Sequence, residues 1–458
     1  MIQFNKNNLD KSNSPYLQQH KNNPIYWQEW SSEVLDYAKR NGKIVFLSIG
    51  YATCHWCHVM AQEAFSHQEI ADYLNKHFVS IKVDREQRSD IDHYMMSYIQ
   101  ETQGQGGWPL NVFLTPDGKP FLALTYVPVL PSYGLPGFLG LLYEVKKTYS
   151  EYPGEIPAYQ LHLHKEESFK EPEIIKIIKQ NFTGSGFGFG PQFPPHNTLI
   201  FLLYYYEGSK DKETKEILGA FLESIANRGL HDHLQGGFYR YCVDDSWTIP
   251  HFEKMLYDQA MLLWVYSLAY KILKKQEYKV IAEKIISCLE ETYRDFSSDL
   301  PSDISPDIFS DVSRDILRPY PISDSSADYL YSAAYDADTE HDEGRTYLWT
   351  KKELQQYLTI EEYQHFNDLY ILEPNFEDRI HLIKKKDGFL PDIEKKLLSI
   401  RKQRPQPFRD RKYITSWNAL LGIAFLVSFR SLGIEGLKER ACLLFQNILR
   451  KHYHKGLL

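Results

Sequence analysis

Apolar and polar positions follow different rhythms in the two parts of the chain. From Ser31 to about Tyr149, short apolar runs typical of buried strands alternate with segments of helical spacing. The expected strands are Ile44–Ile49, Phe78–Val83, Leu110–Leu114 and Phe121–Val127, the last two forming a hairpin. The expected helices are Ser31–Arg40, Ile91–Gln103 and a helical stretch between Phe65 and Phe78. This pattern predicts an α/β domain over residues 1–150.

Beyond about Tyr152 the strand signals nearly vanish and amphipathic helices take over. The expected helices cover residues 198–208, 212–227, 251–272, 277–294, 351–358, 360–371, 390–403, 416–432 and 436–452. Between them, the Ser- and Asp-rich stretch Ser297–Ser326 is too polar to order a core of its own and is expected to form a surface loop. We therefore predict a linker over residues 151–190 and an all-α domain over 191–458.

Length and composition limit the class of protein. A chain of 458 residues is long enough for two or three domains, and a formal charge of −8 argues against nucleic-acid and anionic-membrane partners. Five cysteines are too few for a secreted disulfide framework. The N-terminus lacks the apolar core of a signal peptide, and the longest apolar run, near Met261–Tyr270, is too short to span a bilayer. We expect a cytoplasmic protein.

The most specific motif is Cys54-His55-Trp56-Cys57, which follows the strand Ile44–Ile49 and precedes a helical stretch beginning near Val59. A thiol at a helix N-terminus faces unpaired backbone N–H groups, which lower its pKa to about 3.5–7.5 in such motifs. Cys54 is therefore the expected attacking thiolate, and Cys57, one turn later, the resolving thiol. A charged His55 would stabilise the thiolate further. The motif predicts a redox pair that acts on a disulfide-bearing protein or a small thiol.

Three other interpretations of the motif remain open at this stage. With His58 the motif also spells a c-type haem attachment site, a chemistry that belongs with export. Zinc could be held by Cys54, Cys57 and His55 or His58, but the sequence has no second ligand pair at the spacing typical of a zinc finger. Two reduced, buried cysteines are the third interpretation. We expect no metal and no cofactor.

A second group of chemically active residues lies in the helical part. His231, Asp232 and His233 precede Gly236-Gly237, and polar and aromatic residues follow at Tyr239, Asp245, Trp247, His251, Glu253, Tyr257 and Asp258. Pro250 suits the first helical position, which would place His251 in the first turn, where the helix dipole favours a neutral imidazole that can act as a base. Glu253 with Tyr257, and Lys254 with Asp258, stand four residues apart on this expected helix, and the second pair is equally consistent with a structural ion pair.

These residues suit two kinds of sugar chemistry. An epimerase needs one group to remove the proton α to a carbonyl and another to return it on the opposite face. A glycosidase needs two carboxylates, for which Asp232, Glu253, Asp336 and Asp338 are candidates. Trp417 and Asn418 begin another apolar helix and offer a stacking face and a polar contact, although a tryptophan there also suits a core position.

Long runs of the first part resemble a known family. NSPYLQQHKNNPIYWQEW, FLSIGYATCHWCHVM, FVSIKVDRE and GQGGWPLNVFLTPDGKPF are similar to the thioredoxin-like domain of the spermatogenesis-associated thioredoxin-domain proteins and their bacterial homologues. In thioredoxin-like folds a cis-proline packs beside the C-x-x-C motif. The resemblance implies that Pro109, in the run GGWP, has this role beside Cys54.

The resemblance extends into the helical part through HDHLQGGFYRYCVDDSWTIPHFEKMLYDQAMLL, YDADTEHDEGRTYLW and RDRKYITSWNALLGIAF. It implies an (α/α)₆ toroid of the six-hairpin glycosidase kind, similar to sugar 2-epimerases, with a sugar site at one mouth. Members of the family continue past the position of Leu458, and about nine helices cannot complete a ring of twelve, so we expect an incomplete toroid. The implied function is thiol-disulfide exchange with sugar binding or processing. The alternative is a redox-sensing or chaperone-like protein with a non-catalytic helical domain.

Overall fold

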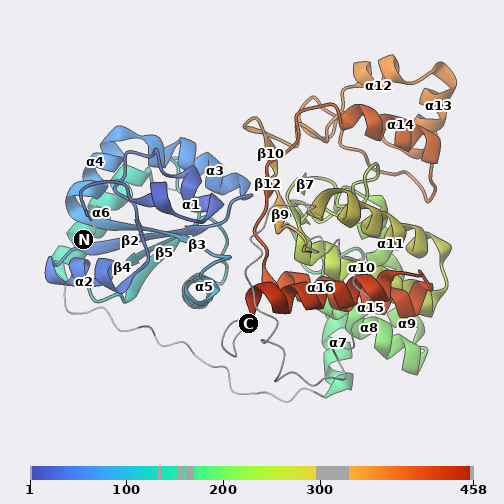
Figure 1. Cartoon of the computed structure of the whole chain (residues 1–458), viewed down its shortest axis with the longest axis horizontal. Coiled ribbons are helices and arrows are strands. Elements are labelled where there is room, and N and C mark those ends of the chain that lie inside the picture. Colours follow the sequence, from blue (N-terminus) through green and yellow to red (C-terminus); the bar gives the residue numbers. More distant parts are fainter. Residues whose placement is uncertain (1–2, 133–135, 153–158, 160–169, 295–329, 454–458) are drawn as a thin grey trace. The chain divides into compact units, whose positions relative to one another are not determined.

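The computed structural model describes residues 3–132, 136–152, 159, 170–294 and 330–453 (Figure 1). It contains two compact units. The first consists of Met1–Glu171 together with the short segment Asp336–Asp338, and the second of Pro172–Tyr335 and Thr339–Leu458. The surface loop expected at Ser297–Ser326 lies outside the described residues.

The first unit is built on a five-stranded sheet in the order β1-β3-β2-β4-β5 (Figure 1). β1 and β2 run parallel to β3, whereas β4 is antiparallel to both β2 and β5. Every residue of β2, β3 and β4 is buried, which explains their nearly continuous apolar runs. The strands span Gln28–Glu29 (β1), Ile44–Gly50 (β2), Phe78–Asp84 (β3), Leu110–Leu114 (β4) and Pro120–Leu124 (β5). The predicted strands and the hairpin are confirmed.

Helices pack on both faces of this sheet. α2 and α5 contribute Val34 and Met95 to a core that includes Leu47 of β2. On the other face, Phe46 contacts Phe138, the first residue of α6. α2 begins where the sequence predicts, because the Ser31 hydroxyl accepts the Val34 backbone N–H. The helices of this unit are α1 (Pro15–Gln19), α2 (Ser32–Arg40), α3 (His55–Gln62), α4 (Gln68–His77), α5 (Ser89–Gln103) and α6 (Phe138–Glu151).

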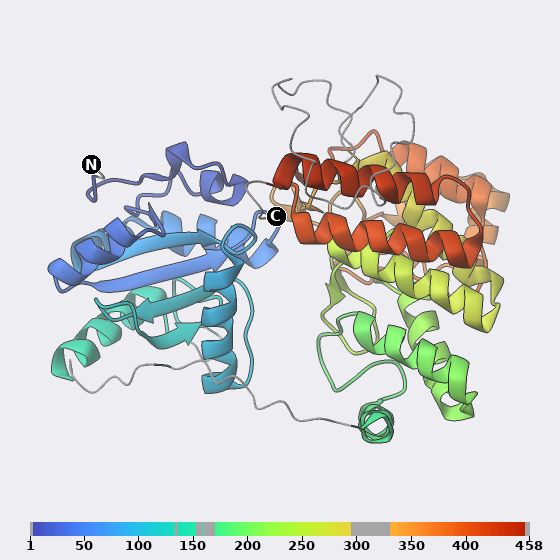
Figure 2. The ribbon, with the colours of Figure 1, turned by 60° about the horizontal axis from the view of Figure 1, so that its bottom comes forward.

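The second unit is mainly helical. α10 and α15 lie at its centre, since α10 contacts α8, α11 and α15, and α15 contacts α16. Figure 2 shows α15 and α16 running side by side in opposite directions. The helices are α7 (Glu171–Asn181), α8 (His196–Ser209), α9 (Lys212–Asn227), α10 (Leu256–Leu273), α11 (Gln276–Cys288), α12 (Lys351–Tyr357), α13 (Ile360–Leu369), α14 (Pro391–Arg401), α15 (Thr415–Leu432) and α16 (Leu437–His452). All nine predicted helices are present, and α7 is an addition.

One predicted boundary is wrong. α10 begins at Leu256, and His251 lies in the short strand β7 (Pro250–His251), which pairs with β6 (Tyr241–Cys242). The Asp244 carboxylate accepts backbone N–H groups from Thr248 and Ile249, which holds the connecting turn in place. Pairing with β6 therefore overrides the helix-starting preference of Pro250. The other short strands are β8 (Lys254–Met255), β9 (Ala334–Tyr335), β10 (Asp338–Thr339), β11 (Asp342–Glu343) and β12 (Arg409–Asp410).

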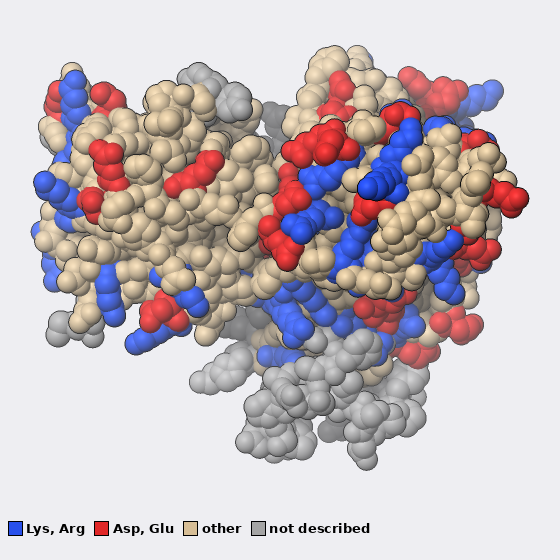
Figure 3. Space-filling model, turned by 90° about the horizontal axis from the view of Figure 1, so that it is seen from above, with Lys and Arg blue, Asp and Glu red and all other residues tan. Residues whose placement is uncertain are grey.

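Surface charge and helix hydropathy test whether nucleic acid or a membrane could be a partner. On the face drawn in Figure 3, lysines and arginines of the helical unit lie among aspartates and glutamates. On this face, mixed charge of this kind does not create the positive field that attracts nucleic acid. Within the described residues, none of the helices combines the length and the apolar character needed to cross a membrane.

Candidate functional site

Cys54 and Cys57 are joined by a disulfide at the start of α3. Cys54 is the N-cap residue of this helix, and its Sγ accepts the backbone N–H of Cys57 at 3.2 Å. The helix begins at His55, earlier than the sequence indicates, so the first sulfur lies directly at the positive end of the helix dipole. Cys54 is 3% exposed and Cys57 2% exposed, so that an incoming disulfide or thiol has only a small area to approach. This geometry places a backbone N–H donor at Cys54 Sγ, where a helix N-terminus favours negative charge.

Pro109 follows a cis peptide bond from Trp108. It directly precedes β4, whose first residue Leu110 pairs with Ile49 near the end of β2. Because the chain continues from that end of β2 into Cys54, the proline and the disulfide lie at the same end of the sheet. This position agrees with the role that the family resemblance implies for Pro109.

The two histidines of the motif have carboxylate partners in the segment Asp336–Asp338 of the same unit. His55 Nδ1 lies 2.7 Å from Asp338 Oδ1, and His58 Nε2 lies 3.0 Å from both carboxylate oxygens of Asp336. Burial alone would lower the pKa of His58, but its hydrogen bond to Asp336 and the negative charges of Asp336 and Asp338 outweigh burial and raise the pKa. The redox motif therefore has charged neighbours that the sequence pattern does not connect to it.

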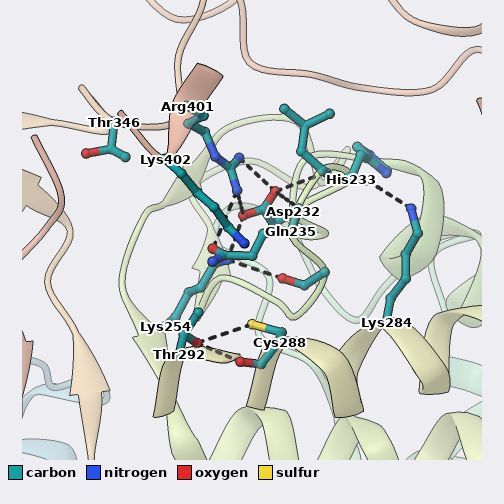
Figure 4. Close-up of polar contacts among 12 residues, drawn as sticks. Asp232, His233, Gln235, Lys254, Lys284, Cys288, Thr292, Thr346, Arg401 and Lys402 are labelled. Atoms are coloured by element: carbon teal, nitrogen blue, oxygen red, sulfur yellow. Dashed lines mark hydrogen bonds and ion pairs between the residues drawn. The ribbon is translucent and has the colours of Figure 1, made fainter. Parts of the chain in front are cut away.

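In the helical unit, the predicted site residues His231 and Asp232 are buried in the protein interior. Asp232 accepts two hydrogen bonds from Arg401, at 2.9 and 2.8 Å, and one from Lys254 at 2.6 Å (Figure 4). Burial alone would raise the pKa of Asp232, but the two cations hold it well below its usual range. His231 Nδ1 bonds to the Ala226 carbonyl at 3.0 Å. These contacts give both residues a structural role.

Two further predictions about this group are wrong. Lys254 does not pair with Asp258, because it precedes α10 and reaches Asp232 instead. Asn418, expected to offer a polar contact, is fully buried and binds both the backbone N–H and the backbone carbonyl of Tyr331. Extended backbone before α10 and long-range packing of α15 account for both differences.

Four of the predicted residues lie in a polar and aromatic layer around the start of α10. Its central cation is Arg240, which binds Glu253 and the Tyr257 hydroxyl, each at 3.2 Å. The predicted helical spacing of Glu253 and Tyr257 does not exist, since Glu253 precedes α10. His251 Nδ1 lies 2.5 Å from Glu343 Oε1, and Trp417 meets the Tyr257 ring edge-on at 4.9 Å. Arg240 and Glu343 are additions to the predicted set.

A cavity of about 480 Å³ opens where α8, α10 and α15 begin. The residues that line it are Pro194, Pro195, His196, Asn197, Thr198, Met261 and Leu420. His196 Nε2 lies 3.4 Å from Asp258 Oδ1, and burial lowers the pKa of His196 to about 4. A neutral imidazole at pH 7 can accept a proton. Sequence reasoning missed His196, although Pro194-Pro195 directly before a helix was a signal for it.

Metal binding was one of the open interpretations of the cysteine motif. Across the part of the chain that the structure describes, no group of three or more His, Cys, Asp or Glu side chains is arranged to hold a metal ion. The two motif cysteines are linked to each other, and the two motif histidines to carboxylates. The disulfide differs from the interpretation in which both cysteines are reduced.

The chain is similar in sequence to one protein family and to several known proteins. Residues 6–165 match the thioredoxin-like DsbH family, described as "Protein of unknown function, DUF255". The chain is 34% identical over 456 residues to uncharacterized protein B0495.5 of Caenorhabditis elegans, which covers 91% of this chain and 61% of that protein. It is 32% identical over 506 residues to spermatogenesis-associated protein 20 of Rattus norvegicus, with 95% and 60% covered. The chain thus spans about 60% of the length of these relatives.

Solved structures resemble each part. A DsbH oxidoreductase covers 28% of this chain and 85% of its own, with 19% identity and a TM-score of 0.21. Cellobiose 2-epimerase from Spirochaeta thermophila covers 61% of this chain and 51% of its own, with 12% identity and a TM-score of 0.34. The expected order of an α/β domain followed by a helical domain is confirmed by the structure, and the family match supports a thioredoxin-like first domain. Residues 6–165 thus match the thioredoxin-like DsbH family, and the chain is similar over most of its own length to spermatogenesis-associated protein 20.

Proposed function

We propose that the thioredoxin-like domain carries out thiol-disulfide exchange through Cys54 and Cys57. The observation that carries the proposal is the hydrogen bond from the Cys57 backbone N–H to Cys54 Sγ at the N-terminus of α3. The same N–H can stabilise a Cys54 thiolate. In the reduced protein, that thiolate attacks a substrate disulfide and expels one substrate thiolate. The Cys57 thiolate then attacks Cys54 Sγ, which restores the disulfide and releases the second substrate thiolate.

Exchange with glutathione disulfide and with insulin tests this proposal. Cys54→Ser is expected to abolish turnover, because it removes the attacking sulfur. Cys57→Ser is expected to accumulate a mixed disulfide on Cys54, visible by mass spectrometry. Cys442, a free cysteine of the helical unit, provides the matched control, and Cys442→Ser should turn over at the wild-type rate. Unchanged turnover in Cys54→Ser would refute the assignment.

For the helical unit we propose a sugar as the ligand, bound at the cavity beside His196. The proposal is supported by the combination of an open cavity of about 480 Å³, a histidine close to a carboxylate, and a nearby aromatic pair. Protein sites for sugars combine apolar or aromatic walls with a few fixed polar groups. In the cavity, Met261 and Leu420 supply apolar walls, and His196 with Asn197 the polar groups. The Tyr257–Trp417 pair lies on the same two helices, α10 and α15.

Two histidines suit proton transfer in this unit. His196 is the expected base, which removes the proton α to the carbonyl of an open-chain sugar. His251, whose Nδ1 contacts the Glu343 carboxylate, is the expected second group, which returns a proton to the opposite face of the resulting enediol. The sugar keeps its composition and changes only the configuration at C2, and both histidines exchange their protons with water between turnovers.

Incorporation of solvent deuterium at C2 of aldoses such as mannose tests the second proposal. Both His196→Ala and His251→Ala should abolish incorporation, whereas alanine at the exposed His365 of α13 should not change it. Calorimetry with the same sugars measures binding separately from chemistry. Absence of any sugar binding would overturn the proposal and favour the alternative, a redox-sensing or chaperone-like protein whose helical domain is a docking surface.

A further inference from the structure

A buried phenol lies behind the redox disulfide. Tyr16 of α1 is fully buried, and within the described residues its hydroxyl has no hydrogen-bond partner. Buried hydroxyl groups are nearly always paired, because removing such a group from water without a partner is unfavourable. Tyr16 therefore keeps a polar atom where a phenylalanine ring would pack as well. The position of that atom suggests why.

The hydroxyl lies beside Cys57. A β carbon added to Gly50 would lie 2.3 Å from the Tyr16 hydroxyl oxygen and 2.8 Å from Cys57 Sγ. The oxygen and the sulfur are therefore at most about 5 Å apart, on the same side of the last residue of β2. Only glycine leaves room for both atoms there. The absence of a side chain at position 50 thus allows the phenol to approach the sulfur.

The groups around Tyr16 do not take its proton. Lys82 Nζ donates to Ser48 Oγ at 3.0 Å and lies 5.2 Å from the centre of the Tyr16 ring. His20 meets that ring edge-on at 4.9 Å and bonds to Asn23 through Nδ1. Burial, together with the negative charge of Asp84, raises the pKa of Tyr16 well above its usual value. The phenol thus stays protonated and remains available as a donor.

We propose that the Tyr16 hydroxyl donates a hydrogen bond to the Cys57 thiolate that forms when the disulfide opens. This inference rests on the exchange activity proposed above and names a residue that assists it. An incoming thiolate attacks Cys54 Sγ, and the electron pair of the broken S–S bond leaves with Cys57 Sγ. A second thiolate then attacks the mixed disulfide and releases Cys54 as a thiolate. Tyr16 stabilises the first leaving group by this hydrogen bond.

Reduction of the oxidised full chain by glutathione measures this step. Because hydrogen bonds to charged groups are among the stronger ones, Tyr16→Phe is expected to slow the first step about ten-fold or more. The same variant should unfold at the wild-type urea concentration or above it, since it removes only an unpaired hydroxyl. The control is Tyr98→Phe, at a tyrosine that packs into the core of the same unit. A Tyr16→Phe rate within two-fold of wild type, or an equal loss in Tyr98→Phe, would overturn the proposal.

A second measurement separates Tyr16 from the exchange activity as a whole. In the Cys54→Ser background, the pH midpoint of Cys57 alkylation reports the acidity of that thiol without any turnover. Adding Tyr16→Phe should raise this midpoint by about one pH unit, equivalent to a ten-fold weaker preference for the thiolate. An unchanged midpoint would refute the role of Tyr16 even if the wild type exchanges disulfides. If the midpoint rises but the wild-type chain does not exchange disulfides, the hydrogen bond from Tyr16 to the Cys57 thiolate would be supported and the proposed function refuted.

Discussion

The buried charges around Asp232 predict that two substitutions, Asp232→Asn and Lys254→Met, differ strongly in their loss of stability. Asp232, Lys254 and Arg401 have side chains at most 4% exposed, and together they place two cations around one carboxylate. Asp232→Asn would leave both cations buried without a counter-charge. Lys254→Met would leave the two-bond pair of Asp232 with Arg401, which is neutral as a whole. The first change should therefore be far more destabilising than the second.

The expected magnitudes follow from the burial of the three groups. Removing one partner of a buried ion pair costs about 3–5 kcal/mol, because the remaining charge is left unpaired. Replacing Lys254 with a flexible apolar side chain of similar length should cost about 1 kcal/mol or less. The pKa of Asp232 is held well below its usual range, so this contribution is present above the unfolded pKa near 3.9 and disappears only as the pH falls through the folded value. The difference between the variants should thus stay constant between pH 5 and 7.

Hydrogen exchange in α14, the helix that carries Arg401, is the appropriate assay. It reports the stability of the helical unit, whereas the unfolding signal of the whole chain would mix two domains. Urea series at several pH values would give the free energy of opening for each variant. Equal losses in Asp232→Asn and Lys254→Met, or a loss below about 1 kcal/mol in Asp232→Asn, would refute the charge argument.

Three other predictions concern single sites. Gly50→Ala should destabilise the first unit by about 1–3 kcal/mol, because the new carbon overlaps the Tyr16 hydroxyl and Cys57 Sγ; an unchanged urea midpoint would contradict this crowding. The raised pKa of His58 stabilises the fold below the unfolded pKa near 6.5, and this contribution is lost as the pH rises through the folded value. Asp336→Asn should lower the pKa of His58, measured by NMR titration, and flatten that pH dependence. His196, with its pKa lowered to about 4, should destabilise the helical unit by on the order of 3 kcal/mol as the pH falls from 6.5 to 4, and His196→Asn should remove this acid sensitivity.

The first domain and its redox motif could be predicted in large part from local patterns. The apolar run at Ile44–Gly50 specifies a buried strand, and the Ser31 cap specifies the start of α2. The strand-to-helix turn at Cys54 identifies the reactive sulfur, because the unpaired N–H groups at a helix N-terminus are a local property. What local patterns could not supply is the set of groups around the sulfur. His58 meets Asp336 across 278 residues, and Tyr16 reaches Cys57 only because the sheet brings α1 to Gly50.

In the helical domain, too, some features follow from local patterns and others do not. Its helices follow from apolar spacing, since each helix satisfies its own backbone hydrogen bonds and needs only one apolar face. The extended conformation of His251 does not follow from apolar spacing, because pairing between β6 and β7 overrides the preference of Pro250 to begin a helix. One partner of Asp232 is Arg401, 169 residues away, and one neighbour of Asp258 is His196 on another helix. Local spacing was enough to place most helices and strands. Which charged side chains meet depends instead on tertiary packing, because packing brings together elements that are distant along the chain.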